Sequence, residues 1–251
     1  MASSGVVYVA FGRNYSYQAA FSAMSLRMFS DIPIRVLSNL ADDKTWRGIA
    51  GVEWVHCRGE NKDNRDVKTD MFRHSPFDRT LYLDTDTAIR SRSFLQGFRM
   101  LDEWDVMGVS ADNPLRGPED TCKLGVYALA NARLGYRFPV ELVNGGMLFF
   151  RKSGETKRFF ATWHAAWAKL GRGRDMPALA WALQQCVPPL KFRLLPLTWN
   201  CPVPSSRAVI AHAWGKHRLP GIPSITKLKP NMHDNATWHK RAGVIDLDAR
   251  T

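Results

Sequence analysis

Short apolar runs alternate with amphipathic stretches along the first half of the chain, a pattern typical of a largely parallel sheet with helices on its faces. The run Val6–Phe11 ends at Gly12 and predicts a buried first strand. Apolar residues between Tyr15 and Phe29 then recur at the spacing of a helix packed on that sheet. The same criteria predict further strands and another helix before residue 110. The strands are Ile34–Leu37, Val52–Val55, Leu81–Leu83 and Val106–Val109, and the helix is Val67–Arg73, which stops near Pro76.

The second half of the chain begins with a segment, 111–141, that is rich in Gly, Pro and Asn and has no strong periodicity, which is typical of functional or mobile loops. Beyond it the pattern predicts alternating strands and helices, and a Pro-rich basic end that wraps the surface. We expect one domain over residues 1–220, with a basic tail over 221–251 packed on it. The predicted elements are a strand at Met147–Phe150, a helix with Phe159, Phe160, Trp163, Trp167 and Leu170 on one face, a short helix at Pro177–Leu183, and strands at Phe192–Leu195 and Val209–Ala211.

Length and composition fit one large α/β domain or two small ones, and they indicate a folded protein rather than a disordered chain. The chain has 251 residues, of which 45% are hydrophobic, so it can bury a substantial core. It contains no run of 18 apolar residues, and its first residues lack the apolar run of a secretory signal. These features, with scattered cysteines that form no CxxC pair, predict a cytoplasmic protein with free thiols. The four cysteines are Cys57, Cys122, Cys186 and Cys201.

Positive charge is concentrated in the second half of the chain. Residues 1–125 carry 16 Lys/Arg and 17 Asp/Glu, whereas residues 126–251 carry 19 and 6, a balance of +13. A field of that size favours polyanionic partners such as nucleic acid, anionic lipid or acidic polysaccharide. The alternative is a basic surface that serves solubility alone.

Two carboxylates end the predicted strand in the segment LYLDTDT at 81–87. Asp84 and Asp86 come at the edge of the sheet where α/β proteins bind ligands, and both side chains can turn toward one cation. Hard divalent ions such as Mn²⁺ or Mg²⁺ prefer oxygen ligands of this kind, and such an ion can neutralise a diphosphate leaving group. The alternative is that the two aspartates are helix caps or solvated turn residues.

Three further motifs follow in a fixed order, and together with LDTDT they resemble the retaining GT-A glycosyltransferases of family 8, the glycogenin and galactosyltransferase-like type. The resemblance spans about residues 6–220. It implies an α/β GT-A nucleotide-diphospho-sugar transferase fold with a mostly parallel central sheet and flanking helices. It also implies a nucleotide-sugar donor, a UDP-sugar being the family's usual choice, Mn²⁺ or Mg²⁺, and retention of configuration. The motifs are NGGMLFF at 144–150, DMPA at 175–178 and HAWGKHRLP at 212–220.

The resemblance implies that Asp84, Asp86 and His212 bind the metal, with Asp86 the more direct ligand. Imidazole beside two carboxylates is chemically suitable for Mn²⁺. The family's closing pattern places a glycine three residues after the histidine and a lysine six residues after it, where the cation holds the diphosphate. In this chain Gly215 fits and Arg218 replaces the lysine, while Lys216 is a competing candidate; arginine can bind phosphate bidentately.

The NGG and DMPA motifs would lie beside the donor sugar. Asn144 can hydrogen-bond sugar hydroxyls, and Gly145 and Gly146 let the backbone approach a ligand closely. The alternative is a simple turn before a strand. Asp175 matches the aspartate of the family's Asp-Gln pair, near donor sugar and acceptor, while Met176 replaces the glutamine. Alternatively, or in addition, Asp175 caps the helix that follows it.

The remaining donor contacts come from earlier in the chain. By the same resemblance, the segment from Tyr8 through Ala10 and Phe11 to Gly12 would hold the base and ribose, largely through its backbone. Thr85, between the two aspartates, would lie against the donor. Lys68 resembles a basic residue that the family places near the donor phosphates and sugar, although it fits a solvated helix lysine equally well.

Two readings from other classes stay open at this point. The sequence Leu83–Thr87 also fits the hhhDxDxT pattern of haloacid dehalogenase-type phosphatases, in which Asp84 would be the nucleophile. That motif normally lies on the first strand, whereas several predicted strands precede it here. A non-enzymatic nucleic-acid-binding protein would explain the basic half of the chain but not the two aspartates with His212.

The acceptor hypothesis that best explains the charge is double-stranded DNA bearing 5-hydroxymethylpyrimidines, as modified by some phage glycosyltransferases. Such an enzyme would act in the bacterial or phage-infected cytoplasm and would neutralise many phosphates. It could also need to extract the target base, with Trp199 or Trp214 as supports. The alternative acceptors are cell-envelope glycans or lipid-linked sugars.

Overall fold

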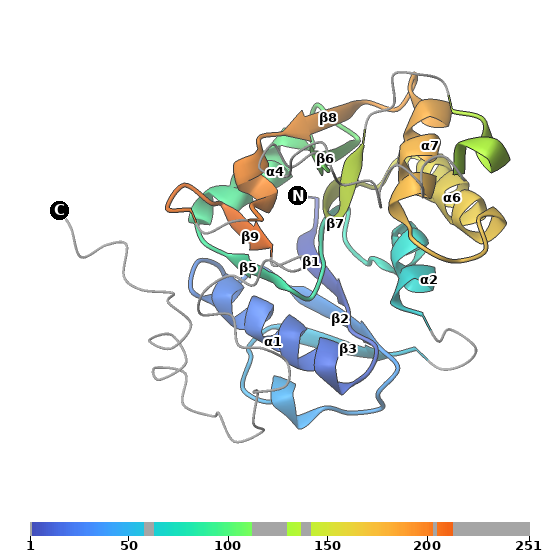
Figure 1. Cartoon of the computed structure of the whole chain (residues 1–251). Helices are drawn as coiled ribbons and strands as arrows, with labels where there is room; N and C mark the ends of the chain where they lie inside the picture. Colours follow the sequence, from blue (N-terminus) through green and yellow to red (C-terminus); the bar gives the residue numbers. More distant parts are fainter. Residues whose placement is uncertain (1, 58–62, 112–129, 137–141, 203–204, 213–251) are drawn as a thin grey trace.

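A seven-stranded sheet forms the centre of the protein, with a two-stranded sheet beside it (Figure 1). The computed structural model describes residues 2–57, 63–111, 130–136, 142–202 and 205–212. The large sheet has the order β3-β2-β1-β4-β7-β6-β8, and β7 runs antiparallel to both neighbours while the other pairings are parallel. The expected mostly parallel α/β architecture is therefore confirmed. The strands are β1 (Ser4–Val9), β2 (Ile34–Ser38), β3 (Val52–His56), β4 (Arg79–Leu83), β5 (Thr87–Ile89), β6 (Val106–Ser110), β7 (Val143–Arg151), β8 (Phe192–Leu195) and β9 (Ile210–His212).

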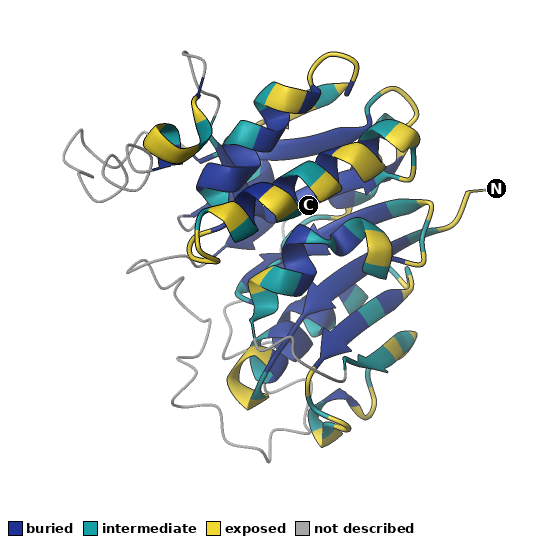
Figure 2. Cartoon of the chain, turned by 90° about the vertical axis from the view of Figure 1, so that its right-hand side faces the viewer, coloured by how far each residue is buried: buried dark blue, intermediate teal, exposed yellow. Residues whose placement is uncertain are grey.

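Helices cover both faces of the large sheet. The helix α1, with the shorter α4, lies on one face, and α2, α3, α6 and α7 lie on the other (Figure 1). The long helix α6 turns its exposed side outward and its buried side toward the sheet (Figure 2). The helices are α1 (Arg13–Arg27), α2 (Asn64–Thr69), α3 (Met71–His74), α4 (Gln96–Met100), α6 (Gly154–Lys169) and α7 (Met176–Cys186), and the 3-10 turns are η1 (Lys44–Trp46), η2 (Arg92–Leu95) and η3 (Leu197–Asn200).

Alternation along the buried strands produces two hydrophobic cores, one on each face. On β1, Val6 and Tyr8 face the core beneath α1, while Val7 and Val9 face the core beneath α6 and α7. This follows from the two-residue period of a strand, which sends successive side chains to opposite faces. The predicted apolar face of the Phe159–Leu170 segment packs into the second core, so that helix is confirmed.

Several predicted element boundaries are wrong, each for a local reason. The expected helix Val67–Arg73 is two helices, because Asp70 leaves helical geometry at φ −108° and ψ 26°. Asn144-Gly145-Gly146 is not a turn before a strand but part of β7, buried on both sides. The strand β5 was not predicted; it forms by pairing with β9, which lies far away in sequence. Most of segment 111–141 and the whole tail 221–251 lie outside the described residues, so the domain boundary stays a prediction.

Candidate functional site

The turn that carries the two aspartates is fixed to the fold by buried hydroxyl groups. Thr87 Oγ1 donates a hydrogen bond of 2.8 Å to the Asp84 carbonyl, which commits the Thr87 hydroxyl hydrogen. Ser22 Oγ lies 2.8 Å from Thr87 Oγ1 and must therefore donate to it, and Tyr8 Oη, 2.9 Å from Ser22 Oγ, donates in turn. A second bond, from Thr85 Oγ1 to Gln18 Oε1 at 2.9 Å, joins the turn to α1. Hydrogen bonds from β1 and α1 therefore hold the Asp84–Thr87 turn in one conformation.

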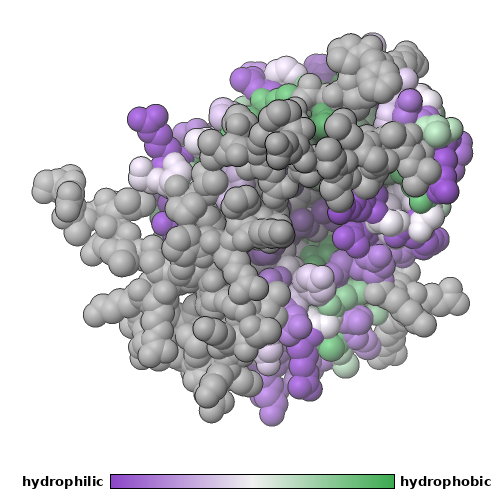
Figure 3. Space-filling model, in the orientation of Figure 1, coloured by the Kyte–Doolittle hydropathy of each residue, from purple (hydrophilic) through white to green (hydrophobic). Residues whose placement is uncertain are grey.

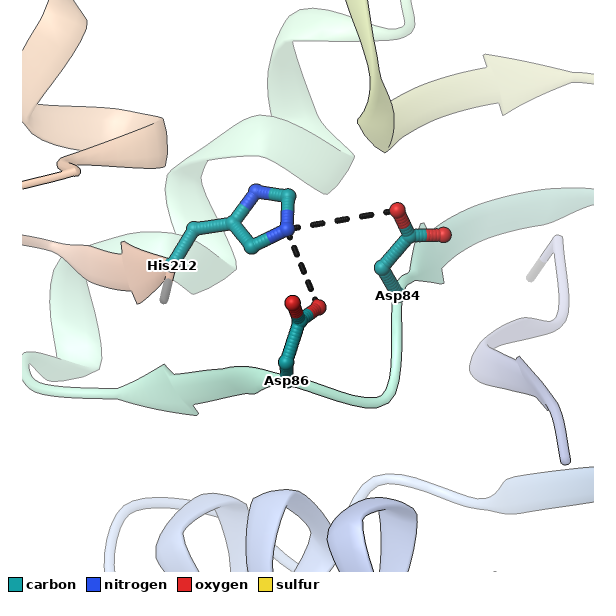
Figure 4. A group of neighbouring side chains, drawn as sticks. All are labelled: Asp84, Asp86 and His212. Carbon is teal, nitrogen blue, oxygen red and sulfur yellow. Dashed lines mark hydrogen bonds and ion pairs between the residues drawn. The ribbon is translucent and has the colours of Figure 1, made fainter. Parts of the chain in front are cut away.

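Pairing of β9 with β5 brings His212 to the same place. The antiparallel register sets His212 opposite Thr87, the residue after Asp86. The His212 Nε2 atom lies 3.0 Å from Asp86 Oδ1 and 3.9 Å from Asp84 Oδ2 (Figure 4). One ligand atom from each of these residues lies within 4.8 Å of the others. The structure thus brings together the three residues expected to bind the metal.

Gly146 makes this approach possible. A Cβ atom at Gly146 would lie 2.1 Å from His212 Cε1 and 2.7 Å from Asp84 Oδ2, closer than atoms can pack. The Asp84 amide also donates to the Gly146 carbonyl at 2.7 Å, which ties β4 to β7 at the site. Two carboxylates and one imidazole that converge beside this glycine of β7 form a donor set that suits Mn²⁺ or Mg²⁺. The residues present therefore fit the divalent cation that the sequence implies.

Burial and charge compete at Asp86. Burial alone would raise the pKa of the Asp86 carboxyl, but the neighbouring His212 and then Lys68 outweigh it, so the pKa lies below its ordinary value. Because the folded-state pKa lies below the unfolded-state pKa of about 3.9, the ionised Asp86 carboxylate stabilises the fold above that pH. This stabilisation is lost as the pH falls through the folded-state pKa. Asp86 is thus an anion at every pH where an enzyme of this kind would work.

Lys68 lies at the centre of an ion-pair network on the opposite side of Asp84. It is not a solvated helix lysine: it is 8% exposed, and its Nζ atom lies 2.9 Å from Asp175 Oδ2 and 3.1 Å from Asp84 Oδ1. Burial would lower the pKa of this amine, but Asp175 and then Asp84 outweigh it and raise the pKa above its ordinary value. Asp175 makes no side-chain capping bond to α7, so its carboxylate serves this network instead.

Tyr82 is a residue of the site that the sequence reasoning missed. Its hydroxyl donates to Asp84 Oδ1 at 2.5 Å, and Lys68 Nζ lies 5.5 Å from the centre of its ring. Burial, and then the Asp84 charge, raise the pKa of this phenol, so it stays a hydrogen-bond donor. The sequence could have indicated this contact, because Tyr82 precedes Asp84 by two residues and strand side chains two residues apart lie on the same face.

A cleft of about 680 Å³ opens beside these groups, and carboxylates, aromatic rings and amide side chains line it. The described residues on the face seen in Figure 3 are mainly hydrophilic, with small apolar patches among them. Such a mixture suits a polar ligand that carries one flat apolar ring. The lining residues are Val9, Phe11, Tyr15, Gln18, Asp63, Asn64, Arg65, Lys68, Tyr82, Asp84, Thr85, Asp86 and Asp175.

Some residues expected to contact the donor lie elsewhere. The Tyr8 side chain is fully buried under α1, and the Ala10 backbone is used by Leu37 and Ser38, so neither lines the cleft. Asn144 is 8% exposed, and its Oδ1 accepts from the Gly146 amide at 2.8 Å within the same strand.

Other expected donor residues either lie close to the Lys68 network or fall outside the structure. A Cβ atom at Gly145 would lie 3.2 Å from Asp175 Oδ2 and 3.4 Å from Lys68 Nζ, so the glycine backs that network. Gly215, Lys216 and Arg218 lie outside the described residues, and their proposed phosphate contacts stay predictions.

Replacing Lys68 with methionine is expected to lower the free energy of unfolding by about 3 kcal/mol, because the buried Asp175 and the half-buried Asp84 would lose their shared partner. Urea denaturation without added metal measures this change. Lys157→Met, on the exposed side of α6, is the matched control and should change stability by less than about 0.5 kcal/mol. Equal stabilities for the two variants would show that the network does not hold the site together.

Comparison with known proteins identifies the class of fold to which this site belongs. No family model and no curated protein matches the chain, but solved structures do. The galactosyltransferase LgtC, in complex with donor and acceptor sugar analogs, matches with a TM-score of 0.62 and 14% identity, over 96% of each chain. The chain therefore has the fold of GT-A glycosyltransferases, and the resemblance stated from the sequence is confirmed at the level of the fold.

Two other structures extend the same likeness. Mouse xyloside xylosyltransferase 1 matches with a TM-score of 0.59 and 13% identity, over 87% of this chain and 100% of its own. The glycosyltransferase GlyE in Streptococcus pneumoniae matches with a TM-score of 0.60 and 13% identity, over 98% of this chain and 61% of GlyE. This fold differs from that of the haloacid dehalogenase phosphatases, and Asp84 follows the fourth strand of the chain rather than the first. The fold and the position of Asp84 therefore argue against the phosphatase alternative.

Proposed function

We propose that this protein is a metal-dependent glycosyltransferase that moves a sugar from a nucleotide-sugar donor, a UDP-sugar, to a hydroxyl acceptor. The observation that carries the proposal is the convergence of Asp84, Asp86 and His212 on a glycosyltransferase fold, with the two aspartates lining the cleft. When bound there, Mn²⁺ or Mg²⁺ would neutralise the negative charge of the diphosphate. The chain holds the carboxylates in place, and Phe11 and Tyr15 offer aromatic surface for the base.

The burial and ion pairing of the Asp175 carboxylate support retention of the sugar's configuration. An inverting transferase needs a free carboxylate base beside the acceptor hydroxyl. Here the Asp175 carboxylate is buried and paired with Lys68 at 2.9 Å, with Arg65 Nε 3.8 Å away. Because this carboxylate is buried and ion-paired rather than free beside the acceptor hydroxyl, the leaving diphosphate would take the acceptor's proton on the same face of the sugar. In this proposal Asp175 orients donor and acceptor rather than removing the proton.

We further propose a polyanionic acceptor, double-stranded DNA bearing 5-hydroxymethylpyrimidines, in a cytoplasmic setting. The support is the +13 balance of residues 126–251, part of which lies on the described surface as exposed Lys157, Arg158 and Lys169 of α6. Lysine and arginine bind phosphates in a salt-dependent way. Trp199 is not a candidate support for an extracted base, because its ring packs in the core 5.9 Å from that of Phe149. Trp214 lies outside the described residues.

Among the helices of the described ranges, none has both the length and the apolar character needed to cross a membrane. A lipid-linked or cell-envelope acceptor is the second candidate, and the assay below separates it from DNA.

The test is donor turnover across a panel of nucleotide sugars with Mn²⁺, with and without DNA that contains 5-hydroxymethylcytosine. We expect release of nucleoside diphosphate that rises at least about tenfold with the modified DNA and falls as salt is added. The product should keep the donor's anomeric configuration by NMR. Metal-dependent hydrolysis that ignores DNA would overturn the DNA acceptor and leave the transferase. DNA binding without any turnover would instead favour the non-enzymatic nucleic-acid-binding protein.

A further inference from the structure

Asn200 is a buried polar residue that touches the metal site without facing the cleft. It ends η3, and the next residue, Cys201, donates to the Ile210 carbonyl and accepts from the His212 amide, both at 2.9 Å. These two bonds align the end of η3 with β9. The Asn200 side chain therefore lies directly behind the His212 imidazole, on the side away from the two aspartates.

The contact between these two side chains is short and completely enclosed. Asn200 Oδ1 lies 2.7 Å from His212 Nδ1, while Asn200 is 0% and His212 is 2% exposed. The Asn200 Nδ2 atom finds no hydrogen-bond partner among the described residues. A buried amide group without a partner destabilises the fold, so packing alone does not account for an asparagine at this position.

The direction of this bond decides which imidazole nitrogen is free. A carbonyl oxygen only accepts, so His212 Nδ1 must carry the hydrogen and donate it to Asn200. In the neutral ring Nε2 then holds a lone pair, and Nε2 is the atom that faces Asp86 Oδ1 at 3.0 Å and Asp84 Oδ2 at 3.9 Å. A lone pair directed at carboxylate oxygens is the arrangement that a shared cation stabilises.

We propose that Asn200 is a positioning residue that fixes His212 in the Nδ1–H tautomer and so presents Nε2 to the metal. The inference rests on the metal site of the proposed function. If the amide were turned over, Nδ2 would donate to Nδ1, and the ring hydrogen would move to Nε2 and block the metal. The two orientations therefore predict opposite metal chemistry, which makes the role testable.

Substitutions that keep or remove the acceptor distinguish these cases. Asn200→Asp keeps an acceptor at the same distance and cannot donate, whereas Asn200→Leu keeps the approximate size and removes the hydrogen bond. We expect Asn200→Leu to weaken Mn²⁺ binding by about 10–100-fold, the usual cost of losing an outer partner of a ligating histidine, and Asn200→Asp to restore it. Mn²⁺ affinity is measured by electron paramagnetic resonance, which requires no donor, acceptor or turnover.

A second measurement stands even if Asn200→Leu fails to fold. Long-range ¹H–¹⁵N NMR of the ¹⁵N-histidine-labelled wild-type protein with Mg²⁺ reports the tautomer directly, with His212→Gln identifying the signal. We expect the hydrogen on Nδ1. A hydrogen on Nε2, or equal Mn²⁺ affinity in wild type and Asn200→Leu, would overturn the role of Asn200 alone. Failure of the wild type to bind Mn²⁺ would overturn the metal site itself, and this inference with it.

Discussion

Asp86→Asn is expected to reduce metal-dependent sugar transfer by about a thousandfold, because stabilising a diphosphate leaving group through a metal contributes several kcal/mol. Asparagine keeps the shape of the side chain and can still hydrogen-bond His212 Nε2, now 3.0 Å from Asp86 Oδ1. The loss would therefore report the missing charge rather than a collapsed site. Steady-state release of nucleoside diphosphate, with Mn²⁺ varied, measures the effect.

A surface aspartate provides the control for Asp86→Asn. Asp42 is exposed and pairs with exposed Arg47, so Asp42→Asn should leave turnover unchanged. If Asp86→Asn retained Mn²⁺-dependent turnover within tenfold of wild type, Asp86 would not be a ligand of the metal.

Gly146→Ala is expected to lower kcat/KM by about a hundredfold, the effect of misplacing a site group by roughly 1 Å. The added methyl group would lie 2.1 Å from His212 Cε1, so the imidazole must move, and 2.7 Å from Asp84 Oδ2. Both displaced groups are proposed metal ligands, so the apparent Mn²⁺ affinity should fall together with turnover. Kinetics at several Mn²⁺ concentrations separate this loss from a loss of folded protein.

Gly154→Ala tests whether the effect is specific to the site. Gly154 begins α6, and a Cβ atom there would meet nothing within 4 Å. Alanine favours a helix over glycine by about 1 kcal/mol, so this variant should keep full activity and equal or slightly greater stability. Full activity in Gly146→Ala would show that His212 need not occupy its observed position for function.

The sequence indicated the main strands and the aspartates for a simple physical reason. A buried parallel sheet needs short apolar runs, and LYLDTDT ends such a run with charges that cannot continue inside the core. The position of Asp84 and Asp86 at the sheet edge followed from that pattern. The NGG segment misled the prediction, since glycines usually mark turns, whereas here the close approach of His212 requires them within a strand.

The rest of the site depends on contacts between distant parts of the chain, which local patterns do not show. His212 meets Asp86 through the pairing of β5 with β9. A strand was expected near β9, but β5 and its pairing with β9 have no local signal. The sequence left open whether Lys68 is a site residue or a solvated helix lysine, because its partners Asp84 and Asp175 come from other elements. Asn200 had no motif at all and was found only from its position behind the His212 ring.

The central claim is that this chain binds a nucleotide sugar through a divalent metal, and isothermal titration calorimetry of UDP-sugars tests it most directly. Binding should appear with Mn²⁺, disappear with EDTA, and be absent in Asp86→Asn at the same metal concentration. Binding that is equally strong in EDTA would contradict the metal-dependent account. No binding of any nucleotide sugar in the presence of Mn²⁺ would contradict the proposed activity itself.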